Sequence, residues 1–432
     1  MAATPSKSVI VVGGSLAGLM HALTLLSLKS PPSVQILERS PTTLLHNQGA
    51  GVVAGNDTLR FFDQYVYSGR GIAVVSPRRH YLDRKGNVVP ETVEDRTQRM
   101  TSWDLLYHLL RWRVEGLDSE YVSGLKQDGR PKANYENGCT VTGLECTSGG
   151  VKLSWNHKDH GEQTATADLI IAADGASSTV RRILHPGVER KYVGYVAWRG
   201  TVPEVDLSES AKQVFVERFT FFHSEGMQIL AYLIPGPNGT LEPGKRLLNW
   251  VWYCNYAEGS PDLEDLMTDI DGRRHAITLP VGKMKDSVWL NQKAYARDVL
   301  PPQYSEAVGK TTQPFVQAIT DVIGRSNSFL NGKVLLVGDA LAGFRPHTAA
   351  STSQAAFDAL TLGQWMGHEI SKDYYDKKVL EYARTVQRQG VELGERSQFG
   401  RHPFNGCHQL EDMVPSAANT FDLFTFSRYS DL

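Results

Sequence analysis

Residues 8–39 read SVIVVGGSLAGLMHALTLLSLKSPPSVQILER, and this stretch decides the fold of the chain. The run of valine and isoleucine at residues 9–12 predicts a buried strand, and residues 16–28 carry apolar side chains at helical spacing. Residues 33–39 predict a second strand. A strand, a helix and a strand in succession predict a βαβ unit with parallel strands. The fold class that follows is α/β.

The turn between the first strand and the helix has the composition of a dinucleotide-binding turn. It consists of Gly13, Gly14, Ser15, Leu16, Ala17 and Gly18. The fingerprint of such turns has glycine at its first, third and sixth positions, whereas here the third position is serine and the second is glycine. Serine is small, and its backbone N–H still faces the helix N-terminus, where anions bind. The turn therefore predicts binding of a dinucleotide.

An acidic residue at the end of the second strand supports this prediction. Glu38 follows Gly18 by 20 residues, the position from which an acid bonds ribose hydroxyls, and Arg39 follows it directly. A solvated charge at a strand end is the alternative interpretation of Glu38. Because the glycine-rich turn precedes it at the right distance, we favour the nucleotide interpretation for Glu38 and include Arg39 with it.

Two more apolar strands each deliver an aspartate into a turn. Asp174 follows the strand in DLIIAADGASSTVR, and Asp339 follows the strand in KVLLVGDALAGFRPHTAAST. Each alone is compatible with an ordinary strand-to-helix turn. After Asp339 the side chains are mostly small up to a helix predicted from about Thr348. A loop with so little bulk indicates that a large ligand lies against its backbone.

The segments between these motifs differ from them in composition and in predicted secondary structure. Residues 134–166 predict a small antiparallel meander, and residues 191–279 predict aromatic-rich, mostly antiparallel strands. Residues 95–116 predict an amphipathic helix, residues 301–323 a loop and a helix, and residues 369–399 one or two long helices. Since nucleotide motifs occur at the start, middle and end of the chain, the nucleotide-binding domain is predicted to be discontinuous.

Composition excludes several classes of function. The chain has 432 residues, of which 41% are hydrophobic and 21% charged, as in ordinary globular enzymes. A net charge of −2 without a Lys/Arg block argues against nucleic-acid binding. No apolar run reaches the ~18–20 residues of a membrane span, and no signal-peptide pattern occurs, so we expect a cytoplasmic protein. The four cysteines and 13 histidines have no metal-binding spacing, so no metal is expected.

The three nucleotide motifs stand in the order found in flavoprotein aromatic hydroxylases. From about Ser8 to Leu362 the chain resembles the single-component, FAD-dependent aromatic monooxygenases with the para-hydroxybenzoate hydroxylase fold, in the 2,6-dihydroxypyridine hydroxylase-like branch. The segments that carry the resemblance are GGSLAGL, GAGVV, TSWDLLYHLLR, YVGYVAWRG, RLLNWVWY and RPHTAAST.

The resemblance assigns FAD-binding roles. It implies that the glycine-rich turn and Glu38 hold FAD, that Asp339 contacts its ribityl or ribose region, and that Asp174 is associated with both FAD and NADPH. The segments 48–53 and 346–351 would lie near the isoalloxazine, which adds Gly51, Pro346, Ala349 and Ala350 to the predicted site. Two positions depart from the family pattern. An arginine usual in the family falls near Ser102 and Trp103, and a glycine usual after Pro346 is Ser351.

The resemblance also implies a domain division. A Rossmann-like FAD-binding domain would comprise residues 1–75, 97–185 and 285–365. An inserted, mostly antiparallel β-sheet layer for the substrate would comprise residues 76–96 and 186–284. Residues 366–432 would form a C-terminal helical segment, and a homodimer is compatible with the sequence.

The activity implied is hydroxylation of an electron-rich aromatic substrate, a phenol, hydroxybenzoate or hydroxypyridine-like ring. NADPH or NADH would reduce FAD, and O2 would react through a C4a-hydroperoxyflavin. Oxidative decarboxylation of a hydroxybenzoate by ipso-hydroxylation is an alternative outcome of the same chemistry. A flavin oxidase without oxygen insertion and a flavin-binding sensor without turnover are alternatives of other classes.

Two residues are candidates for catalysis. Strand alternation in YVGYVAWRG places Tyr195 and Arg199 on one face of a strand, where Tyr195 could contact substrate or simply pack in the core. His347 follows Pro346 beside the predicted flavin site, where it could bond substrate or cap the helix. The sequence does not identify the base.

Overall fold

The nucleotide-binding motifs lie at one end of a six-stranded sheet. The computed structural model describes residues 7–45, 51–402 and 406–407. The sheet has the order β17-β18-β10-β1-β2-β6. Its strands are β1 (Ser8–Val12), β2 (Ser33–Glu38), β6 (Asn134–Asn137), β10 (Leu169–Ala172), β17 (Ser328–Phe329) and β18 (Val334–Leu336). All neighbours except β17 and β18 pair in parallel, so the turns after β1, β10 and β18 meet at the same edge.

Helices cover this sheet and share one apolar core with it. The helix α1, predicted from its apolar spacing, contacts α3 and α9, and α9 contacts α2 and α10. The helices of the chain are α1 (Leu16–Leu26), α2 (Asn56–Phe61), α3 (Trp103–Glu115), α4 (Thr179–Leu184), α5 (Glu209–Phe215), α6 (Pro261–Leu266), α7 (Asp286–Val299), α8 (Pro302–Lys310), α9 (Ser351–Met366) and α10 (Lys372–Phe399). The predicted βαβ unit and the α/β fold class are thereby confirmed.

A ten-stranded, mostly antiparallel sheet forms the second layer. Its order is β15-β16-β11-β14-β13-β12-β4-β5-β3, with β19 paired to β16. Its strands are β3 (Gly51–Val53), β4 (Val74–Tyr81), β5 (Glu94–Ser102), β11 (Lys191–Pro203), β12 (Arg218–Ser224), β13 (Met227–Ile234), β14 (Leu247–Asn255), β15 (Thr278–Leu279), β16 (Phe315–Ile323) and β19 (Ala342–Gly343). Because successive side chains alternate, Trp198, Trp250 and Trp252 join the core under α7 and α8, whereas Tyr195, Tyr253 and Tyr232 face the other way.

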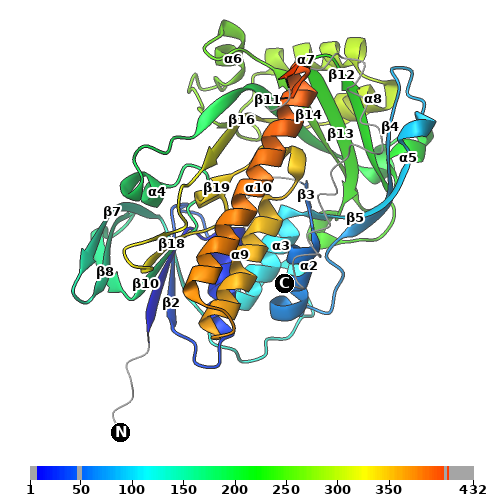
Figure 1. Ribbon diagram of the computed structural model, residues 1–432. Helices are drawn as coiled ribbons and strands as arrows, with labels where there is room; N and C mark the ends of the chain where they lie inside the picture. Colours follow the sequence, from blue (N-terminus) through cyan, green and yellow to red (C-terminus); the bar gives the residue numbers. More distant parts are fainter. Residues whose placement is uncertain (1–6, 46–50, 403–405, 408–432) are drawn as a thin grey trace.

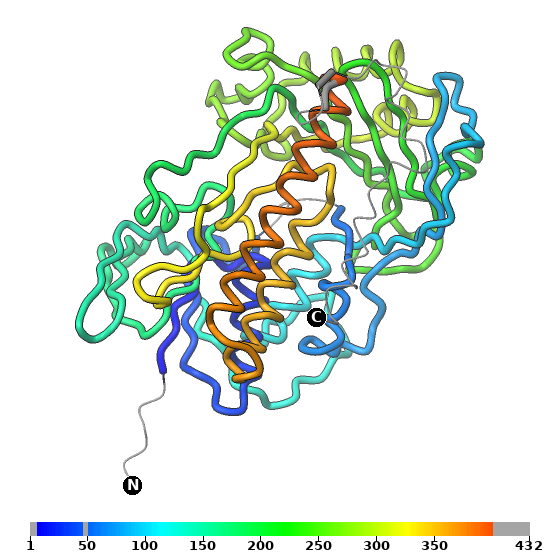
Figure 2. Tube along the Cα trace, viewed as in Figure 1, coloured from blue at the N-terminus to red at the C-terminus, as the bar shows by residue number. Residues whose placement is uncertain are grey.

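Smaller elements complete the fold. The predicted meander is a three-stranded antiparallel sheet of β7 (Cys139–Thr147), β8 (Gly150–His157) and β9 (Gly161–Ala167). Two short strands, β20 (Arg401–His402) and β21 (Gly406–Cys407), pair with each other. The helix α10 contacts α9 as well as β13, β14 and β16, and it runs from one layer to the other (Figures 1 and 2).

Three predictions of secondary structure were wrong in part. Residues 94–102, the first half of the expected helix at 95–116, form β5, in which the buried Gln98 and Met100 alternate with the exposed Arg99. Residues 315–323 form β16 rather than helix, because they pair along β11. The helix expected from Thr348 begins at Ser351 instead, since Ala349 has a left-handed φ of 52°.

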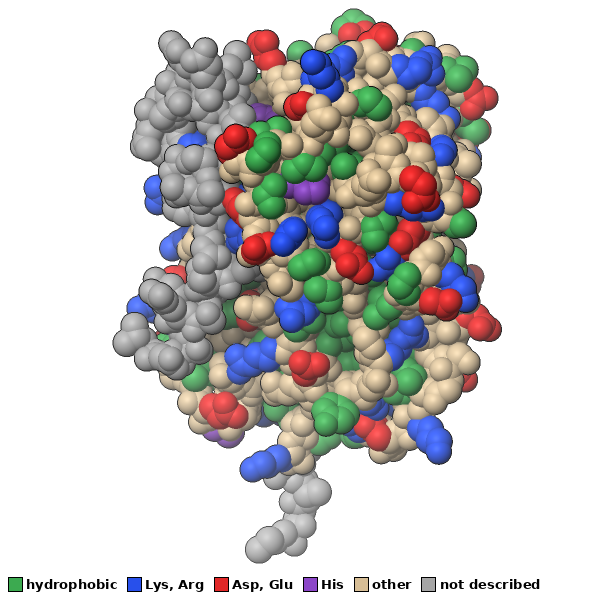
Figure 3. Space-filling view, turned by 90° about the vertical axis from the view of Figure 1, so that its right-hand side faces the viewer, with side chains coloured by type: hydrophobic (Ala, Val, Ile, Leu, Met, Phe, Trp, Pro, Cys, Tyr) green, Lys and Arg blue, Asp and Glu red, His purple; other side chains and the backbone are tan. Residues whose placement is uncertain are grey.

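The division into a FAD-binding domain and a substrate layer stays a prediction. Within it, α7, α8 and β16 had been assigned to the FAD-binding domain by the sequence, yet they pack on or belong to the ten-stranded sheet. In the described part of the chain no helix is both long and apolar enough to cross a bilayer. Positive and negative side chains are interspersed over the face seen in Figure 3.

Candidate active site

The glycine-rich turn after β1 is shaped by close backbone contacts. Gly13 has a φ of 102°, and a Cβ there would lie 2.3 Å from the carbonyl oxygen of Ala173. A Cβ on Gly18 would lie 1.9 Å from the carbonyl oxygen of Gly13. Both positions therefore require glycine, as the fingerprint predicts.

The three nucleotide motifs approach one another closely at glycine residues. A Cβ on Gly338 would lie 2.8 Å from the Cβ of Ala17, and one on Gly343 would lie 3.0 Å from the Cβ of Ala176. The motif of β18 thus lies against those of β1 and β10. The sequence predicted that these motifs belong to one domain, and the structure brings them together.

The N-terminus of α1 offers donors to an anion. Ser15 precedes Leu16 and caps α1 without a side-chain hydrogen bond, and the first turn of the helix contains no acid. The first backbone N–H groups of the helix are therefore left for a ligand. This turn fits the pyrophosphate of FAD.

Glu38 supports the turn directly. Its carboxylate accepts from the backbone N–H of Gly14 at 2.8 Å and from that of Ser40 at 2.7 Å. A carboxylate has about four acceptor sites, so it keeps capacity for a ribose hydroxyl. Arg39 is exposed at the strand end.

Two residues that the sequence analysis missed lie behind the turn. The Tyr135 hydroxyl donates to the carbonyl oxygen of Gly14 at 3.0 Å, and the buried Arg111 lies 3.7 Å from the centre of the Tyr135 ring. Tyr135 is on β6, which pairs with β2. No local sequence signal marks either residue, because their relation to the turn depends on the sheet.

Asp174 precedes the helix α4 and binds its first turn. Its carboxylate accepts from the Ser178 hydroxyl at 2.5 Å and from the backbone N–H groups of Thr179 and Val180 at 2.7 and 3.1 Å. Burial raises the pKa of Asp174, and these hydrogen bonds oppose that shift. The structure thus gives Asp174 a role at the helix start, and its role in cofactor binding stays a prediction.

Asp339 lies in a half-buried position between the motifs. Burial raises its pKa, whereas the charges of Arg190 and Arg181 and a hydrogen bond with Ser351 lower it. Arg181 also donates to the carbonyl oxygen of Ala340 at 2.7 Å, which holds the turn after β18. The structure places Asp339 beside the motif of β10, and its contact with a cofactor hydroxyl stays a prediction.

A cavity of about 260 Å³ lies between one face of the ten-stranded sheet and the segment after β19. Its lining includes Gly51, Pro346, His347, Ala349 and Ala350 of the predicted site. Residues 46–50, part of the segment predicted near the isoalloxazine, are outside the described residues. The cavity therefore joins the predicted flavin segment to the aromatic sheet.

The sheet presents an ordered row of side chains to this cavity. Arg199 on β11 is opposite Val251 on β14, which is opposite Leu230 on β13. Leu230 is opposite Phe221 on β12, and Phe221 is opposite Tyr81 on β4. All five line the cavity. The row forms an apolar floor with one cation at its β11 end.

The cavity is rich in arginine. Arg79, Arg96, Arg199 and Arg396 line it, and no aspartate or glutamate does so among the described residues. Arg79 pairs with Glu94 at 2.9 Å. The Nε of Arg199, however, is buried without a hydrogen-bond partner among the described residues. Arg199 as a whole is half-buried in the cavity wall, and a wall with four arginines and no described carboxylate suits the cavity to an anionic group.

Tyr195 and His347 contact each other. The Tyr195 hydroxyl lies 3.0 Å from His347 Nε2, and His347 Nδ1 lies 3.2 Å from Gln228 Oε1. Tyr195 is fully buried behind His347, so it is His347 that reaches the cavity. Burial, with the charge of Arg345 nearby, lowers the pKa of His347 to about 3. His347 is therefore neutral near pH 7.

The C-terminal helix α10 supplies part of the cavity wall. Leu393, Arg396 and Ser397 line the cavity, and a Cβ on Gly394 would lie 2.6 Å from the Tyr195 oxygen. The sequence of this helix predicts no role for it, because its exposed-helix pattern carries no motif. The glycine at position 394, inside a long helical stretch, is the sequence signal that could have indicated close packing there.

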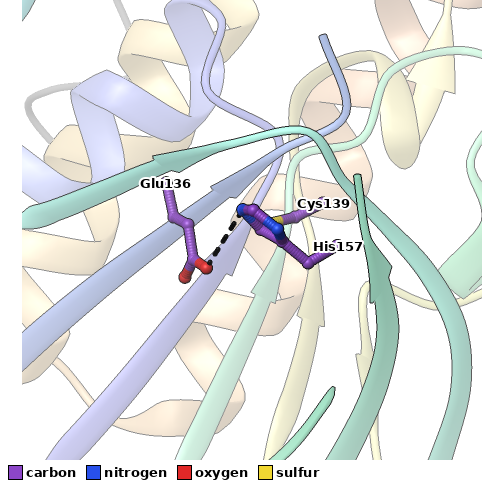
Figure 4. Close-up of side chains that lie close together, drawn as sticks. All are labelled: Glu136, Cys139 and His157. Carbon is purple, nitrogen blue, oxygen red and sulfur yellow. Dashed lines mark ion pairs between the residues drawn. The ribbon is translucent and has the colours of Figure 1, made fainter. Parts of the chain in front are cut away.

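A cluster of Glu136, Cys139 and His157 has potential ligand atoms within 4.8 Å of one another (Figure 4). His157 Nδ1 accepts from the backbone N–H groups of Asp159 and His160 at 3.0 and 3.1 Å. The proton of the neutral ring therefore resides on Nε2, which faces Glu136 at 3.6 Å. A histidine that binds metal normally donates from its other nitrogen, so this geometry favours a His–Glu contact over a metal site.

Comparisons with known proteins place this architecture in a class. Residues 192–321, from β11 to β16, match the family model described as FAD binding domain-like. The chain is 32% identical over 400 residues to 2,6-dihydroxypyridine 3-monooxygenase of Paenarthrobacter nicotinovorans, which covers 91% of this chain and 92% of that relative. The chain therefore belongs to the FAD-dependent aromatic monooxygenases.

A solved structure and a second curated relative show the same similarity. The structure of 2,6-dihydroxypyridine-3-hydroxylase from Arthrobacter nicotinovorans superposes with a TM-score of 0.77 at 28% identity, over 93% of this chain and 96% of that one. Salicylate hydroxylase of Pseudomonas putida is 23% identical over 94% of this chain and 88% of the relative. The predicted resemblance and fold class are confirmed by these findings. The individual site residues stay predictions.

Proposed function

We propose that the protein uses NADH or NADPH and O2 to hydroxylate an aromatic ring that carries an ionisable group, held in the cavity beside the FAD site. The observation that carries this proposal is the lining of the cavity: aromatic walls, four arginines and no carboxylate among the described residues.

Each part of the chain has a stated task in this proposal. The turn after β1, with Glu38 and Asp339, holds the cofactor, and bound FAD supplies the redox chemistry with the nicotinamide and O2. The small side chains of Ala349 and Ala350 leave room for the flavin ring. The first N–H groups of α9, which lacks a side-chain cap, stabilise negative charge near them. Tyr81, Phe219 and Phe221 keep water from the ring.

The test is a screen of phenols, benzoates and hydroxypyridines for stimulated NADH or NADPH oxidation by the FAD-loaded protein. Products formed under isotopically labelled O2 should gain one labelled oxygen by mass spectrometry. Stoichiometric hydrogen peroxide with substrate oxidation and no consumption of NADH or NADPH would instead establish a flavin oxidase. A cytoplasmic location stays a prediction.

Decarboxylative hydroxylation is a second candidate, and Arg199 favours it. Arg199 is a half-buried arginine of the cavity wall, and a guanidinium group suits a substrate carboxylate. The 6-methylsalicylate 1-monooxygenase of Aspergillus terreus is a relative at 26% identity. The ring carbon would gain a hydroxyl group as its bond to the carboxylate breaks and CO2 leaves. Release of labelled CO2 from carboxyl-labelled hydroxybenzoates would distinguish this outcome from hydroxylation at an unsubstituted carbon.

A further inference from the structure

A series of polar contacts leads from the ion pairs of Arg345, through Tyr195 and His347, to Gln228 at the cavity. Arg345 donates from Nε to Asp321 at 2.8 Å and from Nη1 to Glu395 at 2.8 Å. The missing side chain of Gly394 brings Arg345 next to Tyr195, because a Cβ there would lie 3.1 Å from Arg345 Nη1 and 2.6 Å from the Tyr195 oxygen. A hydrogen bond from Arg345 and its charge oppose the rise that burial causes in the pKa of Tyr195.

The position of Arg345 determines which atoms donate and which accept along this series of hydrogen bonds. A guanidinium group is a cation with only donors, so the Tyr195 hydroxyl beside it turns its lone pairs toward Arg345 and its O–H toward His347 Nε2, 3.0 Å away. With Nε2 as acceptor, the proton of the neutral His347 ring is on Nδ1. That nitrogen donates to Gln228, 3.2 Å away, and the Gln228 atom that faces it must be the oxygen.

The orientation of Gln228 follows from this order of donors and acceptors. Because its oxygen is held by His347, its NH2 group is the end of the series, and Gln228 lines the cavity. Gln228 lies between His223 on β12 and Tyr253 on β14 in the sheet. No described residue accepts a hydrogen bond from the Gln228 NH2 group. The series therefore delivers a donor, and no proton acceptor, to the cavity.

We propose that Gln228 binds a ring oxygen of the substrate as an oxyanion, and that His347 is a positioning residue that holds Gln228 rather than the base that ionises the substrate. The proposal rests on the proposed function and narrows its substrate class to aromatic compounds with an acidic ring hydroxyl. The proton of that hydroxyl goes to solvent when the compound binds. The ionised ring is the more electron-rich form, which is the form that an electrophilic hydroxylation requires.

The experiment is a titration of 4-nitrophenol bound to the FAD-loaded protein, in which difference absorbance separates phenol from phenolate. A hydrogen bond to a charged group is expected to favour bound phenolate by about 10- to 150-fold over bound phenol. The pKa of the bound probe should therefore lie about one to two units below that of the free probe. Arginines 79, 96, 199 and 396 and His223 also face the cavity, so the role of Gln228 is measured between variants that keep them.

Gln228→Glu keeps an acceptor for His347 but turns a carboxylate oxygen toward the probe. It should raise the pKa of the bound probe by more than one unit relative to wild type. Gln98→Glu is the matched control, because Gln98 lines the same cavity but is not part of the series of hydrogen bonds from Arg345 to Gln228. The pKa of the bound probe should shift clearly less in Gln98→Glu than in Gln228→Glu. Gln228→Met removes the donor without adding charge and should weaken phenolate binding about tenfold or more. His347→Ala should move the probe in the same direction as Gln228→Met.

Equal shifts in Gln228→Glu and Gln98→Glu would overturn the proposal, because cavity charge alone would then explain them. Binding of the probe as neutral phenol, or failure of the wild type to bind it at millimolar concentration, would do so as well. Flavin absorbance of each variant reports its folding and FAD content. Because no turnover is measured, an NADH or NADPH screen without activity would reject the proposed function while leaving a positive titration intact.

Discussion

The hydroxyl of Tyr195 lies 3.0 Å from Nε2 of His347, although 152 residues separate the two in the chain. Tyr195 comes from the centre of β11, and His347 from the 3-10 turn Pro346–Thr348 that precedes α9. The contact joins the ten-stranded sheet to the turn that precedes α9. It also makes both residues sensitive to the same changes of pH and packing.

The first prediction concerns acid stability. Burial lowers the pKa of His347 from its ordinary value of 6.5 to about 3, so the unfolded chain binds a proton that the folded chain lacks as the pH falls below 6.5. The free energy of unfolding should therefore decrease with falling pH across this range, by at most ~1.4 kcal/mol per pH unit from this residue. In His347→Gln that part of the slope should vanish in urea unfolding of the FAD-loaded protein. Parallel curves for wild type and variant would contradict it.

Asp339→Ala should weaken FAD binding much more than it weakens folding. Loss of a charge-assisted hydrogen bond to a cofactor hydroxyl costs ~1.5–3 kcal/mol, or roughly 10- to 150-fold in affinity. Flavin titration of the apoprotein measures this, and far-UV circular dichroism should stay near wild type. A variant that is purified with full flavin content would remove Asp339 from the site.

Ala349→Asp tests the flavin segment. Aspartate tolerates the left-handed backbone of Ala349, whose φ is 52°, so the change mainly adds charge. Two like charges ~4 Å apart repel by ~4 kcal/mol at an effective dielectric of ~20. In protein that keeps its FAD, the flavin reduction potential should fall and reduction by NADH or NADPH should slow. Ala349→Asn, neutral and of the same shape, is the control, and equal effects of both variants would point to bulk instead of charge.

Gly394→Ala tests how closely α10 packs against Tyr195 and Arg345. The added Cβ would lie 2.6 Å from the Tyr195 oxygen and 3.0 Å from Arg345 Cδ, an overlap that should cost ~1–3 kcal/mol of stability. Gly309→Ala in α8 is the matched control, because no atom lies within 4 Å of its Cβ. There alanine should stabilise the helix by up to ~1 kcal/mol. Thermal unfolding measures both effects, and Gly394→Ala should have a lower midpoint than Gly309→Ala. Equal midpoints would contradict the close packing of Gly394.

The sequence predicted those parts of the fold whose signal is local. The turn at Gly13–Gly18, the strands that end at Asp174 and Asp339 and the aromatic sheet all follow from periodicity and from motifs. Residues 94–102 and 315–323 were predicted wrongly because their strand state depends on partners in β4 and β11. The same reason hid much of the site. Gln228, Arg396 and Tyr135 acquire their roles through sheet register or helix packing, which no window of sequence contains.

The order of strands β18-β10-β1 has a consequence for how the protein is made. Val9 pairs with Leu169, and Ile170 pairs with Val334, so each contact closes a very long loop of chain. Such long-range pairing forms slowly, because loop-closure entropy is lost before the contacts can stabilise it. During synthesis, β1 cannot pair with β10 until residues 169–172 have left the ribosome, and the predicted cofactor site is complete only after β18 has emerged. Nascent chains that stop before residue 334 therefore lack β18 and the predicted FAD-binding turn after it, and we expect flavin capture to be one of the last steps in the maturation of this enzyme.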